Sequence, residues 1–253
     1  MRNHPLLLLE LLSRRIPAGG RRWRERVESI TGVRLAEGLI PTAFQTLPEF
    51  DHDGFLAELA GAPRWLGKGP IALEPAESEA LRASGVTWPV EGWPLDQLGR
   101  VAMVVIASTR LAPSELERLV GDIHRQGETR ERQALLRALP FMIMPERFVA
   151  LAVDACRTNE QPVFEAIACE NPYPAAYFPD LNFNQMVLKA LFLGLALERI
   201  IEIDRRATPE LARMAADYAS ERRAAGRSVP ADIDRLLATG LRGGAPSAPK
   251  TST

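Results

Sequence analysis

From residue 95 onward, apolar residues recur at intervals of three and four positions, which places them on one face of an α-helix. The first such face consists of Leu95, Leu98, Val101, Ala102, Val105 and Ile106. Nowhere does the sequence alternate apolar and polar residues convincingly, as a half-buried strand does. The sequence therefore predicts an all-α protein with more than half of its residues in helices.

Four helix starts beyond residue 110 are evenly spaced. Caps, prolines and apolar faces place them near residues 113, 129, 145 and 161. Ser114 and Glu117 are expected to form a capping box, and Thr129 to cap the following helix. Short helices with tight turns are typical of stacked antiparallel hairpins. We therefore expect such a stack, either as a HEAT-like α-solenoid or as a compact helical array.

The remaining predicted helices and the residue composition indicate three parts of the chain. They are expected at residues 5–16, 20–32, 34–47, 74–84, 181–194, 196–206, 209–225 and 231–239. Residues 1–94 are rich in proline between the helices and form a looped part that closes the stack. Residues 95–240 form the helical-repeat-like part. Residues 241–253 are rich in Gly, Pro, Ser and Thr, which predicts a disordered tail.

Charge and cysteine content narrow the class of protein. The chain has 31 basic and 32 acidic residues, a balance that gives no overall field for nucleic acid. Cys156 and Cys169 are not spaced as a metal or redox motif, which favours thiols in a reducing cytoplasm. Glu10 interrupts the N-terminal leucine run, and no small-residue cleavage site follows it. We expect a cytoplasmic protein that binds no nucleic acid.

Known catalytic and cofactor motifs do not match the sequence. Gly61 to Lys68 has the wrong glycine spacing for a phosphate loop, and His52 between two aspartates is better explained as a solvated turn. Nucleophile-elbow, zinc-protease and dinucleotide patterns are absent. We therefore expect neither a metal nor a cofactor.

Residues suited to recognition are concentrated between 165 and 206. This candidate binding cluster comprises Glu165, Glu170, Asn171, Tyr173, Asn184, Gln185, Lys189, Asp204, Arg205 and Arg206. Such side chains are common at binding surfaces, and Asn and Gln are poor choices for a helix interior. A structural explanation is also open, in which these groups join helix ends and Arg205 and Arg206 meet carbonyls at a helix C-terminus.

Lys189 is the one charge in the apolar stretch Met186–Leu197. A helix that is apolar on nearly every side is expected to be central to the fold. Its lysine must then reach solvent along its own stem or pair with a carboxylate, and Glu165 is the first candidate.

Several segments resemble the EboA family. They are Arg157–Asn159, Phe164–Ala168, Glu170–Ala175, Asn184–Ala190, Asp204–Arg206, Glu210–Met214 and Glu221–Arg222. The resemblance implies a bacterial protein from a secondary-metabolite gene cluster, associated with scytonemin precursors or with prenylated cyclitol-type lipids. Other members of that cluster resemble a membrane prenyltransferase, a metal-dependent hydrolase and a sugar-isomerase-like barrel. No reaction is implied for the EboA member itself.

These observations favour a non-catalytic helical scaffold that binds a pathway enzyme or a lipid-like intermediate. The alternative is an enzyme with an acid–base pocket, for which the candidates are Glu165, Tyr173, Asn184, Lys189 and Arg205. Membrane association, through a partner or through the leucine-rich first helix, is a further alternative.

The Lys189 ion pair is testable by substitution. Lys189→Met keeps the stem but removes the charge, so a buried pair should lose about 3–5 kcal/mol in free energy of unfolding. Adding Glu165→Gln should then recover part of the loss, because coupled partners are not additive. Urea unfolding measures both changes. A loss of under about 0.5 kcal/mol in the single variant would instead indicate a solvated lysine.

Overall fold

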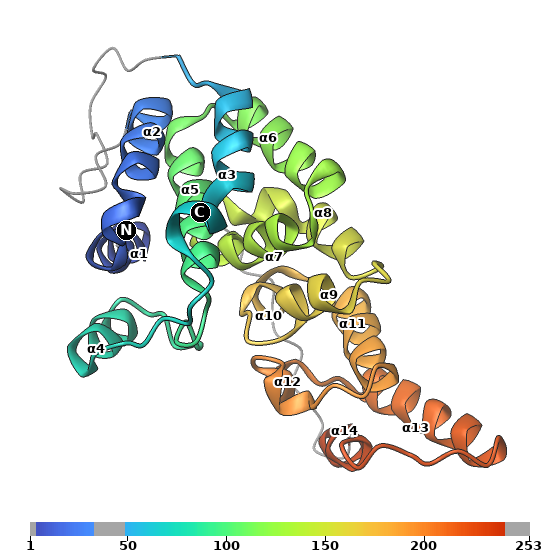
Figure 1. The fold of residues 1–253 in the computed structure, drawn as a ribbon. Coiled ribbons are helices and arrows are strands. Elements are labelled where there is room, and N and C mark those ends of the chain that lie inside the picture. Colours follow the sequence, from blue (N-terminus) through green and yellow to red (C-terminus); the bar gives the residue numbers. More distant parts are fainter. Residues whose placement is uncertain (1–3, 33–48, 241–253) are drawn as a thin grey trace, which may run out of the picture. The chain divides into compact units, whose positions relative to one another are not determined.

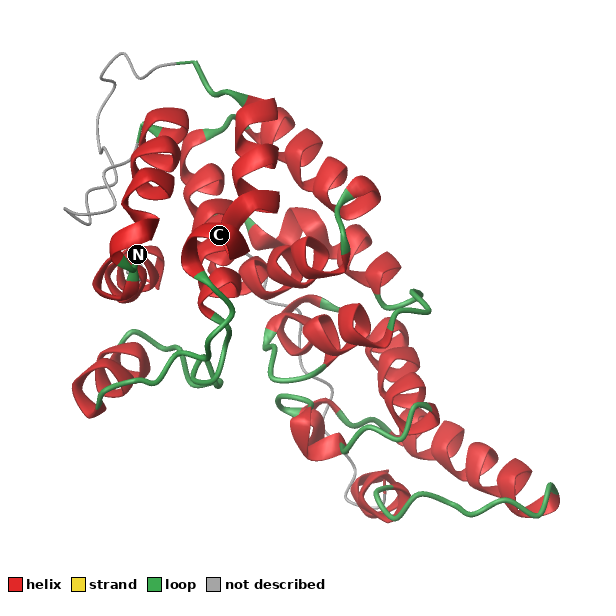
Figure 2. Ribbon diagram, in the orientation of Figure 1, coloured by secondary structure: helices red, strands yellow, loops and turns green. Residues whose placement is uncertain are grey.

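The computed structural model describes residues 4–32 and 49–240, and this part of the chain is all-helical (Figure 2). It contains one isolated antiparallel bridge, between Pro70 and Pro94, and no strand. The prediction of an all-α protein is thus confirmed, while the stacked, HEAT-like arrangement stays a prediction. The helix expected at 34–47 and the tail expected at 241–253 lie outside the described residues.

The chain divides into two compact units, Met1–Ile167 and Ala168–Thr253. The boundary predicted near residue 94 lies within the first unit and stays a prediction. The helices of the first unit (Figure 1) are α1 (His4–Arg15), η1 (Ala18–Gly20), α2 (Arg21–Thr31), α3 (His52–Leu66), α4 (Pro75–Ala83), α5 (Leu95–Arg110), α6 (Pro113–Gln126), α7 (Thr129–Ala138), η3 (Leu139–Phe141), η4 (Pro145–Phe148), α8 (Val149–Ala155) and α9 (Gln161–Ala168), whose last residue begins the second unit.

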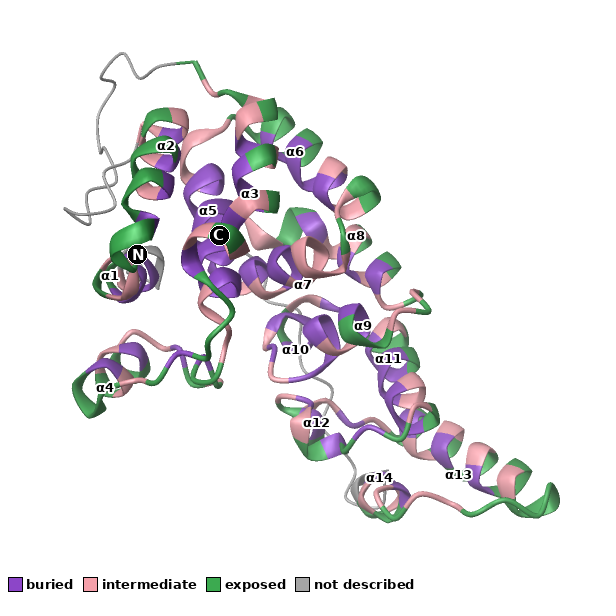
Figure 3. Ribbon diagram, in the orientation of Figure 1, coloured by how far each residue is buried: buried purple, intermediate pink, exposed green. Residues whose placement is uncertain are grey.

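Helix α5 is the core of the first unit. Every residue from Asp96 to Ser108 is buried, and α1, α2, α3 and α7 pack against it (Figure 3). Its apolar side chains contact several neighbours at once, as expected for a helix without a solvent face. The buried stretch nevertheless includes Asp96, Gln97 and Arg100, so these polar groups need partners inside the protein.

A buried ion-pair network satisfies Asp96 and Arg100. Asp96 is fully buried and accepts hydrogen bonds from Arg100 and, through both carboxylate oxygens, from Arg130 on α7, at 2.6 and 3.1 Å. Gln97 donates to the backbone carbonyl of Arg130 at 2.9 Å. Burial lowers the pKa of Arg100, and the neighbouring Asp96 opposes that shift. The network therefore ties α5 to α7.

Arg100 also ties α5 to α3, at a point where a proline has removed a hydrogen-bond donor. Helix α3 contains Pro63, which has no N–H for the carbonyl of Leu59 four residues earlier. The Nε of Arg100 donates to that carbonyl at 2.8 Å, and its Nη2 donates to Ala60 at 3.3 Å. The arginine thus supplies the bond that the helix lacks.

Helix α3 is an element that the sequence patterns missed, because its region is crowded with prolines. Asp51 caps the helix by accepting from the N–H of Gly54 at 2.9 Å, and Pro63 lies in its C-terminal part. Phe55, Leu59, Ala62 and Leu66 form its buried face. The sequence patterns predict no defined helix at residues 52–66, and the structure has one there.

The evenly spaced helix starts are confirmed. Elements begin at Pro113, Thr129, Pro145 and Gln161, the third as a 3-10 turn. Two cap assignments are wrong, by two residues for α6 and by one residue for α7. Helix α6 begins one residue before Ser114, where Glu115 accepts from the N–H of Ala112, and Glu128 precedes Thr129 as the cap of α7.

The described helices of the second unit range from 3 to 16 residues in length. They are α10 (Tyr173–Tyr177), α11 (Asp180–Phe192), η5 (Leu197–Arg199), α12 (Ile203–Arg206), α13 (Pro209–Ala224) and α14 (Ile233–Gly240). Thr208 caps α13 by accepting from the N–H of Leu211 at 3.1 Å, as its sequence signal predicts. The single helix expected at 196–206 is two short helices, with Glu202 in a left-handed conformation before the second.

Replacement of Arg100 tests the network. Arg100→Met should lower the free energy of unfolding by about 3–5 kcal/mol, because Asp96 loses a buried partner and the Leu59 carbonyl loses its donor. Arg118→Met, on the exposed side of α6, is the control and should change it by under about 0.5 kcal/mol.

Pro63→Ala should then recover about 1 kcal/mol in the Arg100→Met background, because residue 63 regains an N–H for the Leu59 carbonyl. In the parent protein, Pro63→Ala should raise the free energy of unfolding by less than this, because Arg100 already donates to the Leu59 carbonyl. Urea denaturation of all four combinations measures this coupling, and equal effects of Pro63→Ala in both backgrounds would contradict it.

Candidate functional site

The candidate binding cluster is divided between the two units. Glu165 lies on α9 in the first unit, where its carboxylate accepts from the amide of Gln161 at 2.9 Å. The other nine residues belong to the second unit. Lys189 is half-buried on α11, and its pairing with Glu165 stays a prediction.

Glu170 forms a double link with Arg199. The backbone of Glu170 adopts a left-handed conformation just after α9, and its N–H donates to the carbonyl of Arg199 at 2.7 Å. The Arg199 guanidinium then returns two hydrogen bonds to the Glu170 carboxylate, at 2.7 and 3.0 Å. The pair fixes the turn after α9 against η5. Arg199 was not among the predicted residues, because its partner lies 29 positions away.

Asn171 and Tyr173 build the start of α10. Asn171 is buried, and its Oδ1 accepts from the N–H of Tyr173 at 3.0 Å. Tyr173 is fully buried, with its ring centre 4.9 Å from that of Tyr177 and 6.3 Å from that of Phe178. These residues therefore shape an aromatic core within the second unit.

Arg206 caps the C-terminal end of α10. Its guanidinium donates to the carbonyls of Pro174, Ala175 and Phe178 at 3.2, 2.5 and 2.7 Å, and to the Asp180 carboxylate at 3.1 Å. It also lies 4.6 Å from the ring centre of Phe183. A cation is favourable at a helix C-terminus, where carbonyls lack partners. Arg206 thus joins α10, α11 and α12, which agrees with the structural explanation given above.

Asn184 connects α11 to the start of α13. It is 2% exposed, and its amide donates to the hydroxyl of Thr208 at 3.3 Å. Its Oδ1 is buried and accepts no hydrogen bond from the described residues. With so little exposure, Asn184 acts in packing α11 against α13.

Asp204 and Arg205 point to different partners. Asp204 accepts two hydrogen bonds from Arg235 on α14, at 2.9 and 2.7 Å, and these bonds raise the pKa of Arg235. Arg205 is exposed and pairs with Glu202 three positions earlier. The structure therefore distributes the polar groups of the cluster over several helix junctions.

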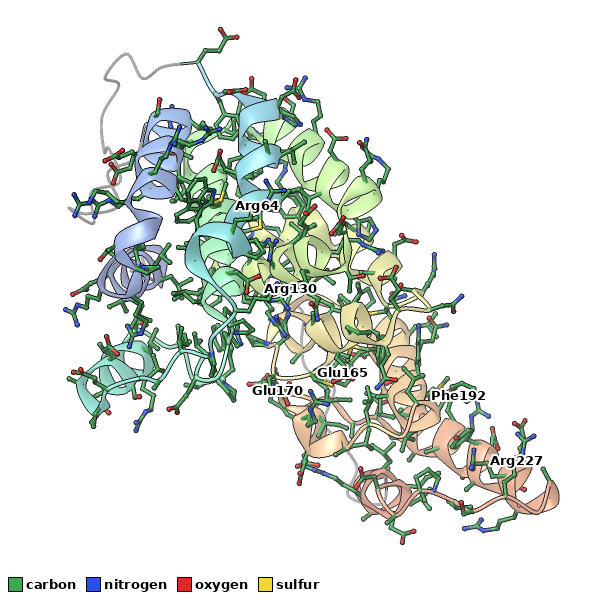
Figure 4. The ribbon with its side chains drawn as sticks, viewed as in Figure 1. Arg64, Arg130, Glu165, Glu170, Phe192 and Arg227 are labelled. Carbon is green, nitrogen blue, oxygen red and sulfur yellow. The ribbon has the colours of Figure 1, made fainter. Side chains whose placement is uncertain are left out.

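Helix α11 has an exposed apolar face that the sequence analysis missed. Leu181 is 60% exposed and Phe192, labelled in Figure 4, is 69% exposed. Leu188 is half-buried between them, and Gln185 is exposed. Spacings of 4, 3 and 4 place these four residues on one side of the helix, which we call the α11 face. The helix was expected to be central to the fold and is in fact partly exposed.

Neither a metal-binding group nor a membrane-spanning helix is present among the described residues. They contain no group of three or more His, Cys, Asp or Glu side chains that could hold a metal ion. None of the helices in the same part of the chain is long and apolar enough to cross a membrane.

Comparison with known proteins identifies one family. The sequence model described as "Metabolite traffic protein EboA" matches residues 45–238, most of the chain. Neither the curated proteins nor the solved structures include a match. The matched range contains the whole candidate binding cluster and the α11 face.

The role of Arg206 is testable against its neighbour. Arg206→Met should lower the free energy of unfolding by about 2–4 kcal/mol, because three carbonyls lose a charged donor. Arg205→Met removes a surface pair and should change it by under about 1 kcal/mol. Chemical denaturation followed by tyrosine fluorescence measures both. Equal effects of the two substitutions would contradict the structural role of Arg206.

Proposed function

Because the chain belongs to the EboA family of metabolite traffic proteins, we propose that it is a non-catalytic accessory protein. In this proposal it binds a partner enzyme or a lipid-like intermediate of a bacterial secondary-metabolite pathway, of the scytonemin-precursor or prenylated cyclitol lipid type. It acts in the cytoplasm, and any contact with a membrane is indirect, through the partner.

The α11 face is the observation that carries the proposal. Large apolar side chains at high exposure, grouped on one helix, are typical of protein interaction surfaces. Leu181 and Phe192 lie about 16 Å apart along the helix, at 1.5 Å per residue. An aromatic residue beside leucines, with Gln185 and Lys189 at the edge, has the composition of a binding hot spot with a polar rim.

The burial of two predicted pocket residues favours this function over an enzyme. Tyr173 is 0% exposed and Asn184 is 2% exposed, so neither side chain has access to a substrate. A general acid or base must come within hydrogen-bond distance of the reacting group. Arg205 is accessible, but it is already paired with Glu202 at the surface.

The helix arrangement of the first unit suits a scaffold. Helices α6 and α7 pack together, as do α6 and α8, and the starts of α6, α7, η4 and α9 keep the interval of 16 residues. We interpret these short packed helices as stacked hairpins of the HEAT-like type. Such stacks expose long surfaces on which partners bind.

Partner binding tests the proposal. The purified chain is mixed in turn with the cluster-encoded prenyltransferase in detergent, the metal-dependent hydrolase and the sugar-isomerase-like protein, and binding is followed by interferometry. Phe192→Ser should weaken the binding of the partner at least tenfold, or about 1.4 kcal/mol, because the face loses its aromatic anchor. Ile143→Ser is the matched control, since Ile143 is 41% exposed but lies on the first unit.

Both outcomes are informative. A large effect of Phe192→Ser with none for Ile143→Ser supports a specific surface on α11. If none of the three proteins binds, or if both variants bind like the parent, the proposed role as a scaffold for a pathway enzyme is wrong.

A further inference from the structure

A cavity of about 170 Å³ lies between α1 and α4 in the first unit, and no residue of the candidate binding cluster lines it. Helix α4 lies beside α1 in Figure 1, and the two helices are in contact. The cavity is lined from α1 by residues spaced three and four apart, and from α4 by one face of that helix. Each wall is thus a single helix face.

The walls of the cavity are largely apolar. Leu7 and Leu11 face it from α1, and Ala80 and Leu81 face it from α4. Leu11 and Leu81 are each 4% exposed, so the inner part is shielded from solvent. The short side chain of Ala80 leaves space where a larger residue would fill the gap. The outer part of the cavity is open to solvent, beside the exposed Glu10 and Arg14.

An ion pair holds α4 in place beside the cavity. Arg15 donates to the Glu77 carboxylate, at 2.9 Å for one of the two bonds, and to the carbonyl of Ala72 at 2.7 Å. Glu77 also accepts from the N–H of Glu74 at 3.0 Å. The hydrogen bond from Arg15 lowers the pKa of Glu77 to about 2, so this carboxylate is charged at neutral pH. The spacing of the two helices therefore does not depend on filling the cavity.

The charges at the mouth of the cavity cancel. Arg14 pairs with Glu10, and its Nη1 lies 3.6 Å from Glu77, which also pairs with Arg15. Two guanidinium groups thus balance two carboxylates. A charged ligand would have to displace one of these partners, whereas a hydroxyl group can add a hydrogen bond to the exposed Glu10 or Arg14 without separating them.

We infer that this cavity binds a small uncharged molecule with an apolar ring or branched hydrocarbon and a hydroxyl group at the mouth. The volume fits that class, since an apolar cavity of about 150 Å³ is large enough to bind benzene. The inference rests on the proposed function in one respect. If the chain handles a metabolite, this cavity is the site that binds the metabolite or its apolar end. That site is separate from the α11 face.

Methyl NMR of the leucine-labelled full-length protein tests the site with cyclohexanol as the probe. The methyl signals of Leu7, Leu11 and Leu81 should shift saturably, with a Kd of about 1–10 mM, as expected for seven non-hydrogen atoms. Cyclohexanecarboxylate and cyclohexylammonium should bind at least fivefold more weakly, because the charges at the mouth are already paired.

Two substitutions on α4 provide the comparison. Ala80→Leu fills the cavity and should weaken cyclohexanol binding at least tenfold. Ala83→Leu makes the same change at an exposed position of α4 outside the cavity and should leave binding unchanged. Shifts that do not saturate, or equal binding by the two variants, would overturn the inference.

The result is independent of the partner experiment. If cyclohexanol binds and Ala80→Leu removes that binding, the cavity site is supported. This holds even if no cluster-encoded protein binds the α11 face. In that case only the role as a scaffold for a pathway enzyme fails. Partner binding without cyclohexanol binding overturns the cavity and leaves the scaffold function supported.

Discussion

The buried pair of Asp96 and Arg100 is the interaction on which the first unit depends. Taking two charges out of water is unfavourable unless each one is paired and hydrogen-bonded. Here the Asp96 carboxylate accepts hydrogen bonds from two arginines, Arg100 and Arg130. Arg100 also donates to the Leu59 carbonyl, which Pro63 leaves without its helical N–H donor. The network therefore fixes how α3, α5 and α7 pack, and it gives the proline in α3 a compensating contact.

Much of the fold could be predicted from local patterns, because helix periodicity and caps are local. The starts at Pro113, Thr129 and Pro209 follow directly from prolines and capping residues. Helix α3 could not be recognised, since Pro63 normally argues against a helix and its compensation comes from Arg100, 41 positions from Leu59. A bond over such a distance leaves no trace in a short sequence window.

The candidate site shows the same limit. The sequence identified a segment rich in polar groups, and the structure gives Arg206 and Asn171 definite structural partners at the two ends of α10. The exposure of Phe192 could not be predicted, because a helix that is apolar on most sides does not reveal which side lacks a neighbour. The α11 face and the cavity between α1 and α4 therefore emerge only from the packing.

Native-state hydrogen exchange along α5 tests the central account most directly. If the buried pair holds the first unit together, the amides of residues 101–107 should exchange only through unfolding of the whole unit. The free energy of opening of these amides should then equal the free energy of global unfolding. In Arg100→Met, both free energies should fall by the same amount. The amides of α4 should exchange more readily than those of α5. Local opening of α5 as easy as that of α4, with no response to Arg100→Met, would contradict the account.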